Sequence, residues 1–423
     1  MHAIQIDRAK RWAKQISVTG AAQIIVQAVG FLSGILVIRL LPIEQYAYYT
    51  IANTMLGTMT VLSDGGISAG VMAQGGKVWQ DKEKLGAVLN TGLYLRKRFA
   101  WVALSITIPI LCYLLWKQGA DWITCVLITA SLIPAFFAAL SDNILQIVPK
   151  LQQSITPLQK NQVSVGIGRL LLSGLTLFAF PWAFVAVFAS GIPRIWGNRN
   201  LKKIAEPYID RSQRANTEVQ VEIMRMVKRI LPGSIYFALS SEITVWLLSI
   251  FGTTTAVAQI GALGRFSLVF SILSSITSIV VLPRIARLNP KSEKKLFFIG
   301  MSILSTFFVC LIAVSLLSVL SPYALWILGD NYSSLKQEFV LVLIAGALKM
   351  LSGLVFGIST ARGKPTNSMH IIVGNIMAIT IGALFFSLNE LAGILSLSIL
   401  IGFTSLIINV LNLFLYLKFF INN

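Results

Sequence analysis

Long runs of apolar residues alternate with short polar segments along the whole chain. An α-helix rises 1.5 Å per residue, so about 20 apolar residues are needed to cross roughly 30 Å of hydrocarbon. Most of twelve such runs reach that length, and we expect helices at 16–41, 46–72, 99–116, 122–148, 163–180, 182–196, 230–251, 257–282, 296–320, 339–360, 371–388 and 391–420. The pattern predicts an all-α polytopic membrane protein with twelve transmembrane helices.

The longest polar interval, 197–229, divides the predicted helices into two sets of six. It is short and highly charged, so we interpret it as a linker without a core of its own. The predicted organisation is a basic N-terminal segment at 1–15, a six-helix bundle at 16–196, the basic linker at 197–229 and a second six-helix bundle at 230–423. A duplicated six-helix unit is common in transporters whose halves rock around a site near the membrane midplane.

The 35 Lys and Arg residues, which contribute to a net charge of +19, fall mostly on one side of the predicted helices. That side carries the N-terminal segment and the connections at 77–98, 150–160, 194–229, 284–295 and 362–364. By the positive-inside rule, this side and both termini are expected in the cytoplasm. The basic excess therefore indicates topology and contact with membrane lipid, and it does not call for a nucleic-acid partner.

Hydrophobic residues make up 56% of the chain and the mean hydropathy is +0.77, which excludes a sizeable soluble domain. Cys112, Cys125 and Cys310 lie in apolar runs without CxxC spacing or a nearby histidine, so we expect buried side chains and no metal site. The chain has no GxxxxGK[ST], HExxH or GxSxG sequence. We therefore expect no catalytic residues, no cofactor and no enzymatic activity.

Several charged residues lie inside the predicted helices, where a charge costs about 2.5–3.5 kcal/mol and so usually faces a cavity or a partner. Glu242, Arg265 and Lys349 are expected near the middle of their helices, and Arg169 closer to an end. The three cations favour an anionic cargo, because guanidinium and ammonium groups both bind phosphate. The alternative for Glu242 and Arg265 is a buried ion pair between neighbouring helices.

Three further side chains are candidates for a cavity. Gln23 and Gln27 share a helix face, and they either line the cavity or join helices by hydrogen bonds. Arg39 either reaches the cavity or extends to the membrane surface. Two acids, Glu242 and Asp64, are candidates for coupling to an ion gradient, because a carboxyl group inside the bundle can exchange a proton or a sodium ion.

Several short motifs recur in one order along the chain. They are RLLPIEQYAYY at 39–49, LSDGGIS at 62–68, VLPRIA at 281–286, LWILGDNY at 325–332, ARGK at 361–364 and VGNI at 373–376. This order resembles the Wzx-type flippases of O-antigen and other polysaccharide repeat units, which belong to the polysaccharide transporter family of the MATE-like MOP superfamily.

The resemblance implies two six-helix bundles around a central cavity. It also implies transfer of undecaprenyl-diphosphate-linked oligosaccharide from the cytoplasmic to the periplasmic leaflet of a bacterial inner membrane, by alternating access coupled to H+ or Na+. The polysaccharide polymerase and the chain-length regulator of the pathway would be further partners.

Two other functions stay open. A MATE-type multidrug or cation antiporter shares the twelve-helix plan but is expected to have an acid-rich cavity. A membrane-embedded O-antigen polymerase is expected to have a large periplasmic loop, whereas the longest outward connection in this chain is 321–338.

Overall fold

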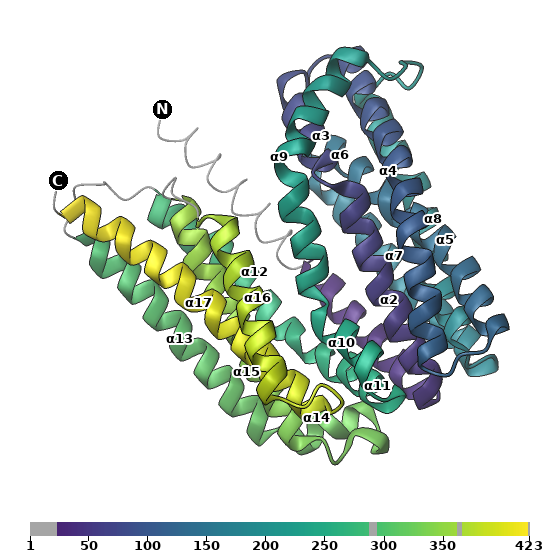
Figure 1. Cartoon of the computed structure of the whole chain (residues 1–423). Coiled ribbons are helices and arrows are strands. Elements are labelled where there is room, and N and C mark those ends of the chain that lie inside the picture. The colour runs from purple at the N-terminus through teal and green to yellow at the C-terminus, as the bar shows by residue number, and fades with distance from the viewer. Residues whose placement is uncertain (1–22, 287–293, 362–365, 422–423) are drawn as a thin grey trace. The chain divides into compact units, whose positions relative to one another are not determined.

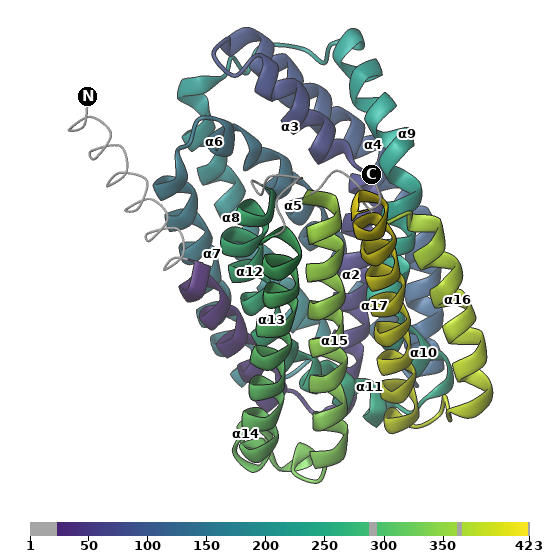
Figure 2. The same cartoon turned by 90° about the vertical axis from the view of Figure 1, so that its left-hand side faces the viewer.

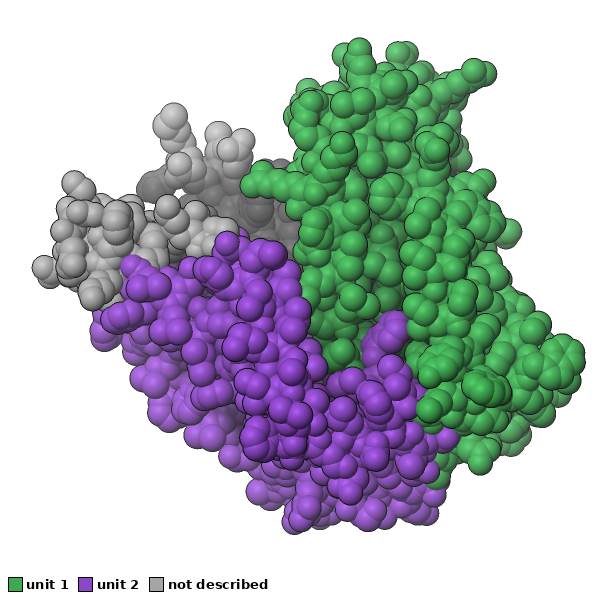
Figure 3. All heavy atoms as spheres, in the orientation of Figure 1, with its two compact units in different colours: residues 1–243 green, residues 244–423 purple. Residues whose placement is uncertain are grey.

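The computed structural model of the 423-residue chain describes residues 23–286, 294–361 and 366–421, and these ranges contain helices and connections but no strand. The chain forms two compact units that meet at Ile243 and Thr244, shown in two colours in Figure 3. The expected basic segment 1–15 lies outside the described residues, as do positions 362–364 of the ARGK motif.

The first unit, shown with the second in Figure 1, is built from antiparallel helices. Its helices are Gln23–Leu40, α2 (Ile43–Asp64), α3 (Ile67–Lys77), α4 (Lys82–Lys117), α5 (Trp122–Leu145), α6 (Ile147–Leu151), α7 (Ile155–Ala179), α8 (Ala183–Ala205), the 3-10 helix η1 (Glu206–Tyr208) and α9 (Thr217–Ser241).

The second unit begins within α10 (Ile243–Phe251). It continues through α11 (Thr254–Leu263), η2 (Gly264–Ser267), α12 (Leu268–Ala286), α13 (Lys294–Val319), α14 (Ser321–Leu328), η3 (Asp330–Tyr332), α15 (Lys336–Ala361), α16 (Ser368–Phe385) and α17 (Leu391–Ile421).

Each of the twelve predicted ranges overlaps one or more of these helices. Among the described residues, nine helical spans are long and apolar enough to cross a membrane, and α9 with α10 forms a tenth, bent by 53°. The two other expected spans, α2 and α8, are also helical. They are less apolar than these ten because they carry many polar or basic side chains. The chain is therefore an all-helical, multi-pass membrane protein.

Two predicted boundaries are wrong. The helix expected at 99–116 begins much earlier, at Lys82, so Arg96 and its basic neighbours lie on a helix and not in a loop. Asp81 caps this helix by accepting hydrogen bonds from the backbone N–H groups of Glu83 and Lys84, each at 3.1 Å. The bond from the Lys84 backbone is the main reason that the pKa of the Asp81 carboxyl is lowered.

The single helix expected at 46–72 is instead two helices, α2 and α3. The chain turns at Gly65 and Gly66, which have φ values of +47° and +99°. This left-handed conformation favours glycine. The segment 197–229, expected as a linker, lies within the first unit, and only 206–216 falls between its two long helices α8 and α9.

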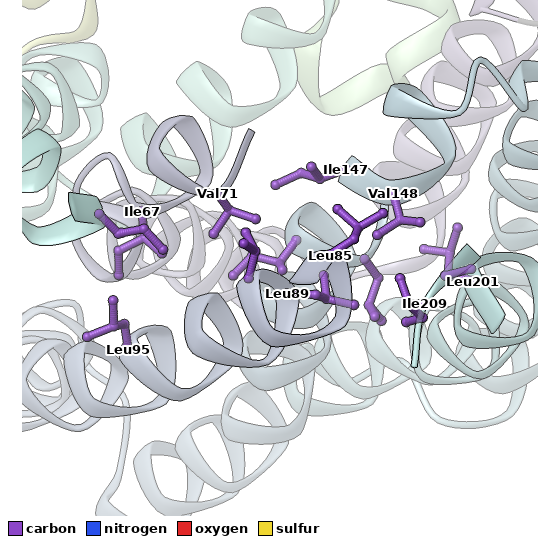
Figure 4. Packing of buried hydrophobic residues seen from close by; sticks show 14 of the residues in the cluster. Ile67, Val71, Leu85, Leu89, Leu95, Ile147, Val148, Leu201 and Ile209 are labelled. Carbon is purple, nitrogen blue, oxygen red and sulfur yellow. The ribbon is translucent and has the colours of Figure 1, made fainter. Parts of the chain in front are cut away.

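Apolar side chains from every helix between α3 and α9 form a core cluster at one end of the first unit (Figure 4). Those labelled there are Ile67 and Val71 of α3, Leu85, Leu89 and Leu95 of α4, Ile147 and Val148 of α6, Leu201 of α8, and Ile209. Gly92 of α4 leaves no room for a Cβ against Val71, so α3 and α4 pack in close contact. Helix periodicity directs these side chains to one face of each helix.

The second unit is built around α15, which packs against α12, α13 and α17. In Figure 2, α15 runs between α13 and α17. Phe270 of α12 lies against Gly346, and a buried hydrogen bond of 3.0 Å joins the amide of Asn409 on α17 to the hydroxyl of Ser352 on α15. Small and amide-bearing residues are the usual means of joining helices in a membrane.

We expect Gly191→Leu to destabilise the first unit. A Cβ at Gly191 on α8 would lie 2.8 Å from the Cβ and 3.0 Å from the Cα of Ala135 on α5, so the backbones would have to separate. Overpacking of this kind costs about 1–3 kcal/mol. The measurement is the thermal unfolding midpoint of the purified protein in detergent. The control is Gly300→Leu on α13, where no atom lies within 4 Å of a new Cβ; equal midpoints for the two variants would contradict the close packing of α5 on α8.

Candidate functional site

Three of the charged residues predicted from the sequence lie where a helix is interrupted. Asp64 is the last residue of α2, before the turn at Gly65 and Gly66. Glu242 separates α9 from α10 at their 53° bend. Arg265 lies in η2, the 3-10 segment that separates α11 from α12. Interrupted helices in membrane proteins place backbone polar groups at sites where ions or ligands bind.

An open cavity of about 480 Å³ lies beside Asp64 in the first unit. It is lined by residues of α2, α3, α5, α6 and α9, which are Thr60, Val61, Asp64, Ser68, Ala69, Met72, Asn143, Ile147, Lys150 and Ser234. The charged side chains among them are Asp64 and Lys150. The other polar groups are hydroxyls and one amide, which can donate hydrogen bonds to an anion or accept them from a sugar.

Arg96, which was expected in a basic cytoplasmic connection, is paired with Asp64 but is not among the residues that line the cavity. Its side chain is 2% exposed, its Nη2 lies 2.7 Å from Oδ1 of Asp64, and its Nη1 donates a 2.6 Å hydrogen bond to the carbonyl oxygen of Leu140. The pair joins α4 to α2, and the second bond joins α4 to α5. Removing either partner of such an ion pair destabilises the protein, because the remaining charge is buried without compensation.

Asp64 has a second set of partners at the start of α3. Its Oδ1 accepts hydrogen bonds from the hydroxyl of Ser68 at 2.6 Å and from the backbone N–H of Ser68 at 3.2 Å. The N-terminus of a helix carries a partial positive charge. The Asp64 carboxylate therefore lies between a guanidinium group and the positive end of a helix.

A second carboxylate, Asp142 on α5, also interacts electrostatically with Arg96. Asp142 accepts a 3.0 Å hydrogen bond from Gln146, whose own side-chain oxygen accepts a 3.3 Å bond from Gln162 on α7. A connected set of polar side chains thus runs from the cavity wall into the bundle. Such connected networks fix the positions of charged groups in a low-dielectric interior.

The position of Arg96 on α4 could have been recognised from helix periodicity. Leu85, Leu89, Gly92, Arg96, Ala100 and Ala103 recur every three or four residues and are all buried. The prediction missed this stripe because Arg96 lies beside Lys97 and Arg98, which are exposed, and the three together resemble a cytoplasmic basic cluster.

The remaining predicted residues of the first unit lie along the helix Gln23–Leu40 and α7. A Cβ at Gly30 would lie 3.5 Å from Nη2 of Arg169, so the guanidinium group of Arg169 contacts this part of the first helix. Gln23 and Gln27 precede Gly30 by seven and three residues, which places them on the same face of the helix. Gln27 is half-buried, whereas Gln23 and Arg39 are exposed.

In the second unit, Arg265 and Lys349 lie at different depths. Phe266, beside Arg265, packs edge-on against Phe339 with ring centroids 5.0 Å apart. Lys349 is ten residues further along α15 than Phe339, which corresponds to roughly 15 Å along the helix. Lys349 therefore lies about 15 Å along α15 from the level at which Phe266 packs. Glu242 belongs to the first unit.

Lys349 is the first residue of an exposed stripe on α15, a helix that is otherwise largely buried. After the first turn of α15, the exposed residues are Lys349, Gly353, Phe356 and Thr360, which follow one another at helical spacing. No atom lies within 4 Å of a Cβ built on Gly353, one turn beyond Lys349. Across the described ranges, no group of three His, Cys, Asp or Glu residues is arranged to hold a metal ion.

No protein-family model matches this sequence, and comparison with curated proteins finds no relative. Solved structures do resemble it. An inward-facing multidrug resistance MATE family transporter of the MOP superfamily aligns with a TM-score of 0.73 at 14% identity, over 93% of this chain and 94% of that one. An outward-facing structure of the same kind aligns with a TM-score of 0.66 at 12% identity, over 97% and 96%.

A third structure is a MOP superfamily transporter from Pyrococcus furiosus Vc1 (DSM3638), described as having a binding pocket of reverse polarity that suggests a different function. It aligns with a TM-score of 0.63 at 13% identity, over 96% of this chain and 94% of that chain. The chain therefore has the helical-bundle fold of MATE-like transporters of the MOP superfamily.

Proposed function

We propose that this protein is a flippase that moves undecaprenyl-diphosphate-linked oligosaccharide from the cytoplasmic to the periplasmic leaflet of a bacterial inner membrane. The fold, which is that of MOP superfamily transporters, supports membrane transport by alternating access. The cargo is inferred from the sign of the charges in the bundle. The motif order that resembles Wzx-type flippases supports the same cargo.

The observation that carries the proposal is the position of Lys349. A lysine at membrane depth on a lipid-facing surface is costly, so it is expected to face water, a partner or a cargo. Lys349 lies on the uncovered face of the helix that forms the centre of the second unit. An ammonium group there suits a diphosphate.

Arg265 supports the same cargo from another position. Its 3-10 segment interrupts a predicted transmembrane span, and Gly264 beside it has no atom within 4 Å of a new Cβ. A guanidinium group at such a break can bind two phosphate oxygens at once. Arg169, Arg39, Gln23 and Gln27 are proposed as further contacts along the path of the headgroup and sugar.

The alternative is a multidrug or cation antiporter, which the fold supports equally. A cationic cargo is expected to meet carboxylates, yet Asp64 is already paired with Arg96 at 2.7 Å. The description of the Pyrococcus structure indicates that pocket polarity differs among proteins of this fold. The charges in this chain therefore favour an anionic cargo over a cationic one.

Ion coupling is proposed at Asp64 or Glu242, both of which lie at helix interruptions. One elementary charge moving through 100 mV releases about 2.3 kcal/mol, so one or two H+ or Na+ ions per cycle would drive a modest gradient of cargo. The polysaccharide polymerase and chain-length regulator are proposed as pathway partners.

The deciding experiment is a flipping assay in proteoliposomes with a fluorescent polyprenyl-diphosphate-linked sugar, with and without an imposed proton or sodium gradient. We expect gradient-stimulated transfer of the lipid-linked sugar and no uptake of a cationic dye. Dye uptake without transfer of the lipid would establish the antiporter and reject the flippase.

Topology can be tested separately at Arg214, an exposed residue between η1 and α9. In a variant without Cys112, Cys125 and Cys310, we expect Arg214→Cys to react with a membrane-impermeant maleimide only after cells are permeabilised, because the basic side should be cytoplasmic. Ser334→Cys, in the connection before α15, should react in intact cells and is the control. Reaction of Arg214→Cys in intact cells would reverse the proposed orientation.

A further inference from the structure

A small cavity lies between α12 and α15 in the second unit. Ser274, Thr277 and Ser278 of α12 and Gly353 of α15 line it, together with apolar side chains of the two helices. Its volume is about 20 Å³, which is enough for one water molecule or one hydroxyl group. Ser278 and Gly353 are exposed, so the cavity is reached from the surface of the unit.

Two of the three hydroxyl groups in this cavity are available to a ligand. Thr277 donates a 2.8 Å hydrogen bond to a backbone carbonyl oxygen of its own helix. Within the ranges that the structure describes, the hydroxyls of Ser274 and Ser278 donate to no protein atom. These two serines are one helical turn apart, so they lie on the same side of α12. Each can donate one hydrogen bond and accept another, as a hydroxyl group of a sugar also does.

The gap between the two helices is centred on Gly353. No atom lies within 4 Å of a Cβ built on this residue. On the same helix, a Cβ on Gly346 would lie 2.7 Å from Phe270 of α12. A Cβ on Gly357 would lie 2.9 Å from Leu282 of α12. The helices are therefore in close contact on both sides of Gly353, and between these contacts there is room for a ligand group without movement of either helix.

Lys349 and Phe356 flank Gly353 on the exposed stripe of α15. Lys349 precedes Gly353 by four residues and Phe356 follows it by three, so the Cβ atoms of these neighbours lie about 5–6 Å from position 353 on the same helix face. The phosphate on the anomeric carbon of a sugar and a hydroxyl across the ring are separated by a similar distance. The side chain of Phe356 is 38% exposed and offers an apolar surface that suits the C–H face of a sugar ring.

We propose that the cavity between α12 and α15 binds one hydroxyl group of the sugar whose phosphate contacts Lys349. The bound hydroxyl donates to one of the two serines, Ser274 and Ser278, and accepts a hydrogen bond from the other. The sugar ring lies over Gly353. A deoxy sugar leaves the serines unpaired, and a sugar with a bulky substituent at that position does not fit the cavity. A site that pairs with a hydroxyl rejects the analogue that lacks it, so the second unit selects among sugars.

This inference rests on the proposed lipid-linked cargo and adds a site for its first sugar. The test compares methyl phosphate with a panel of hexose 1-phosphates, which carry a phosphate monoester without and with a sugar ring. The measurement is the Kd of each ligand for the purified full-length protein in detergent. We expect the wild type to bind at least one hexose 1-phosphate about tenfold or more tightly than methyl phosphate. Lys349→Ala should weaken the binding of both kinds of ligand.

Gly353→Ala places a methyl group at the cavity and should remove the preference for the hexose 1-phosphate. The Kd of methyl phosphate should not change. Alanine favours a helix more than glycine does, and the new Cβ meets no atom within 4 Å, so the thermal unfolding midpoint should not fall. Gly300→Ala on α13 is the matched control, because its Cβ also meets no atom, and it should keep the preference.

Ser274→Ala and Ser278→Ala remove the hydroxyl groups and leave the space unchanged. Each should reduce the preference for the hexose 1-phosphate. Ser275→Ala is the control on the same helix, because Ser275 is exposed and its hydroxyl donates a 2.9 Å hydrogen bond to the carbonyl oxygen of Ser271. It should bind both ligands as the wild type does. A full preference in Gly353→Ala, or an equal loss in Ser275→Ala and Ser274→Ala, would overturn the proposal.

The binding assay also separates the sugar site from the proposed function. Lys349-dependent binding of methyl phosphate without a preference for any hexose 1-phosphate would reject the sugar site and leave the anionic cargo in place. If the wild type binds neither ligand, both the sugar site and the phosphate contact at Lys349 are rejected. The flipping assay tests the cargo independently of either result.

Discussion

Replacing Arg96 with leucine is expected to prevent stable folding of the first unit. The substitution removes the guanidinium group that neutralises Asp64 at 2.7 Å and that bonds to the carbonyl oxygen of Leu140. Breaking one partner of a buried ion pair costs about 3–5 kcal/mol, because the other charge is left without compensation. That amount is a large fraction of the roughly 5–15 kcal/mol by which a typical domain is stable. The measurement is the yield of monodisperse protein after heating in detergent.

The double variant Arg96→Leu with Asp64→Asn is the control for this prediction. It removes both charges, so we expect it to recover a large part of the stability that the single variant loses. Asp64→Asn alone should be milder than Arg96→Leu, since Asp142 also interacts with the remaining guanidinium group. Additive losses in the double variant would mean that the two side chains stabilise the protein independently and would contradict the pairing.

Arg265→Ala and Lys349→Ala are each expected to abolish export of surface polysaccharide while the protein remains in the membrane at normal level. Arg265 lies in an interrupted span and Lys349 on the exposed face of α15, so both side chains are placed where a cargo could reach them. Arg265→Lys should restore export only in part, because lysine keeps the charge but loses the two-pronged contact with phosphate. The readout is surface polysaccharide in a strain that depends on this protein.

Lys336→Ala is the matched control for Lys349→Ala. Both lysines are exposed on α15, but Lys336 is its first residue and lies at the end of the span. Its removal should leave export unchanged. Normal export in Lys349→Ala would exclude that residue from the path of the cargo, and loss of the protein itself would support a structural role.

Most of the helices could be predicted because apolar runs of membrane length have few alternatives. The end of each helix was harder to place. The helix α4 extends to Lys82 through a stretch rich in basic residues, because its buried face is apolar while its other face is charged. Mean hydropathy averages the two faces and therefore underestimates the length of an amphipathic helix.

For the candidate residues too, a local sequence pattern predicted some features, whereas others depend on the fold. Asp64, Glu242 and Arg265 were recognised as charges inside apolar runs, which is a local property. That each lies at a helix interruption depends on backbone geometry, and only the Gly65–Gly66 pair gave a local signal for it. The cavity and the partnership of Asp64 with Arg96 arise from packing between residues that are distant in the sequence, so no local pattern could reveal them.

The hydrogen bonds from Ser68 to Asp64 have a consequence for the angle between α2 and α3. Only Gly65 and Gly66 separate the two helices, and glycine backbones adopt many conformations at little cost. The Asp64 carboxylate crosses this turn to bond with Ser68 of α3, and it is also paired with Arg96 of α4. One side chain at the end of α2 therefore holds two other helices in place, so the direction in which the chain leaves the turn is set by side-chain contacts and not by the glycines themselves.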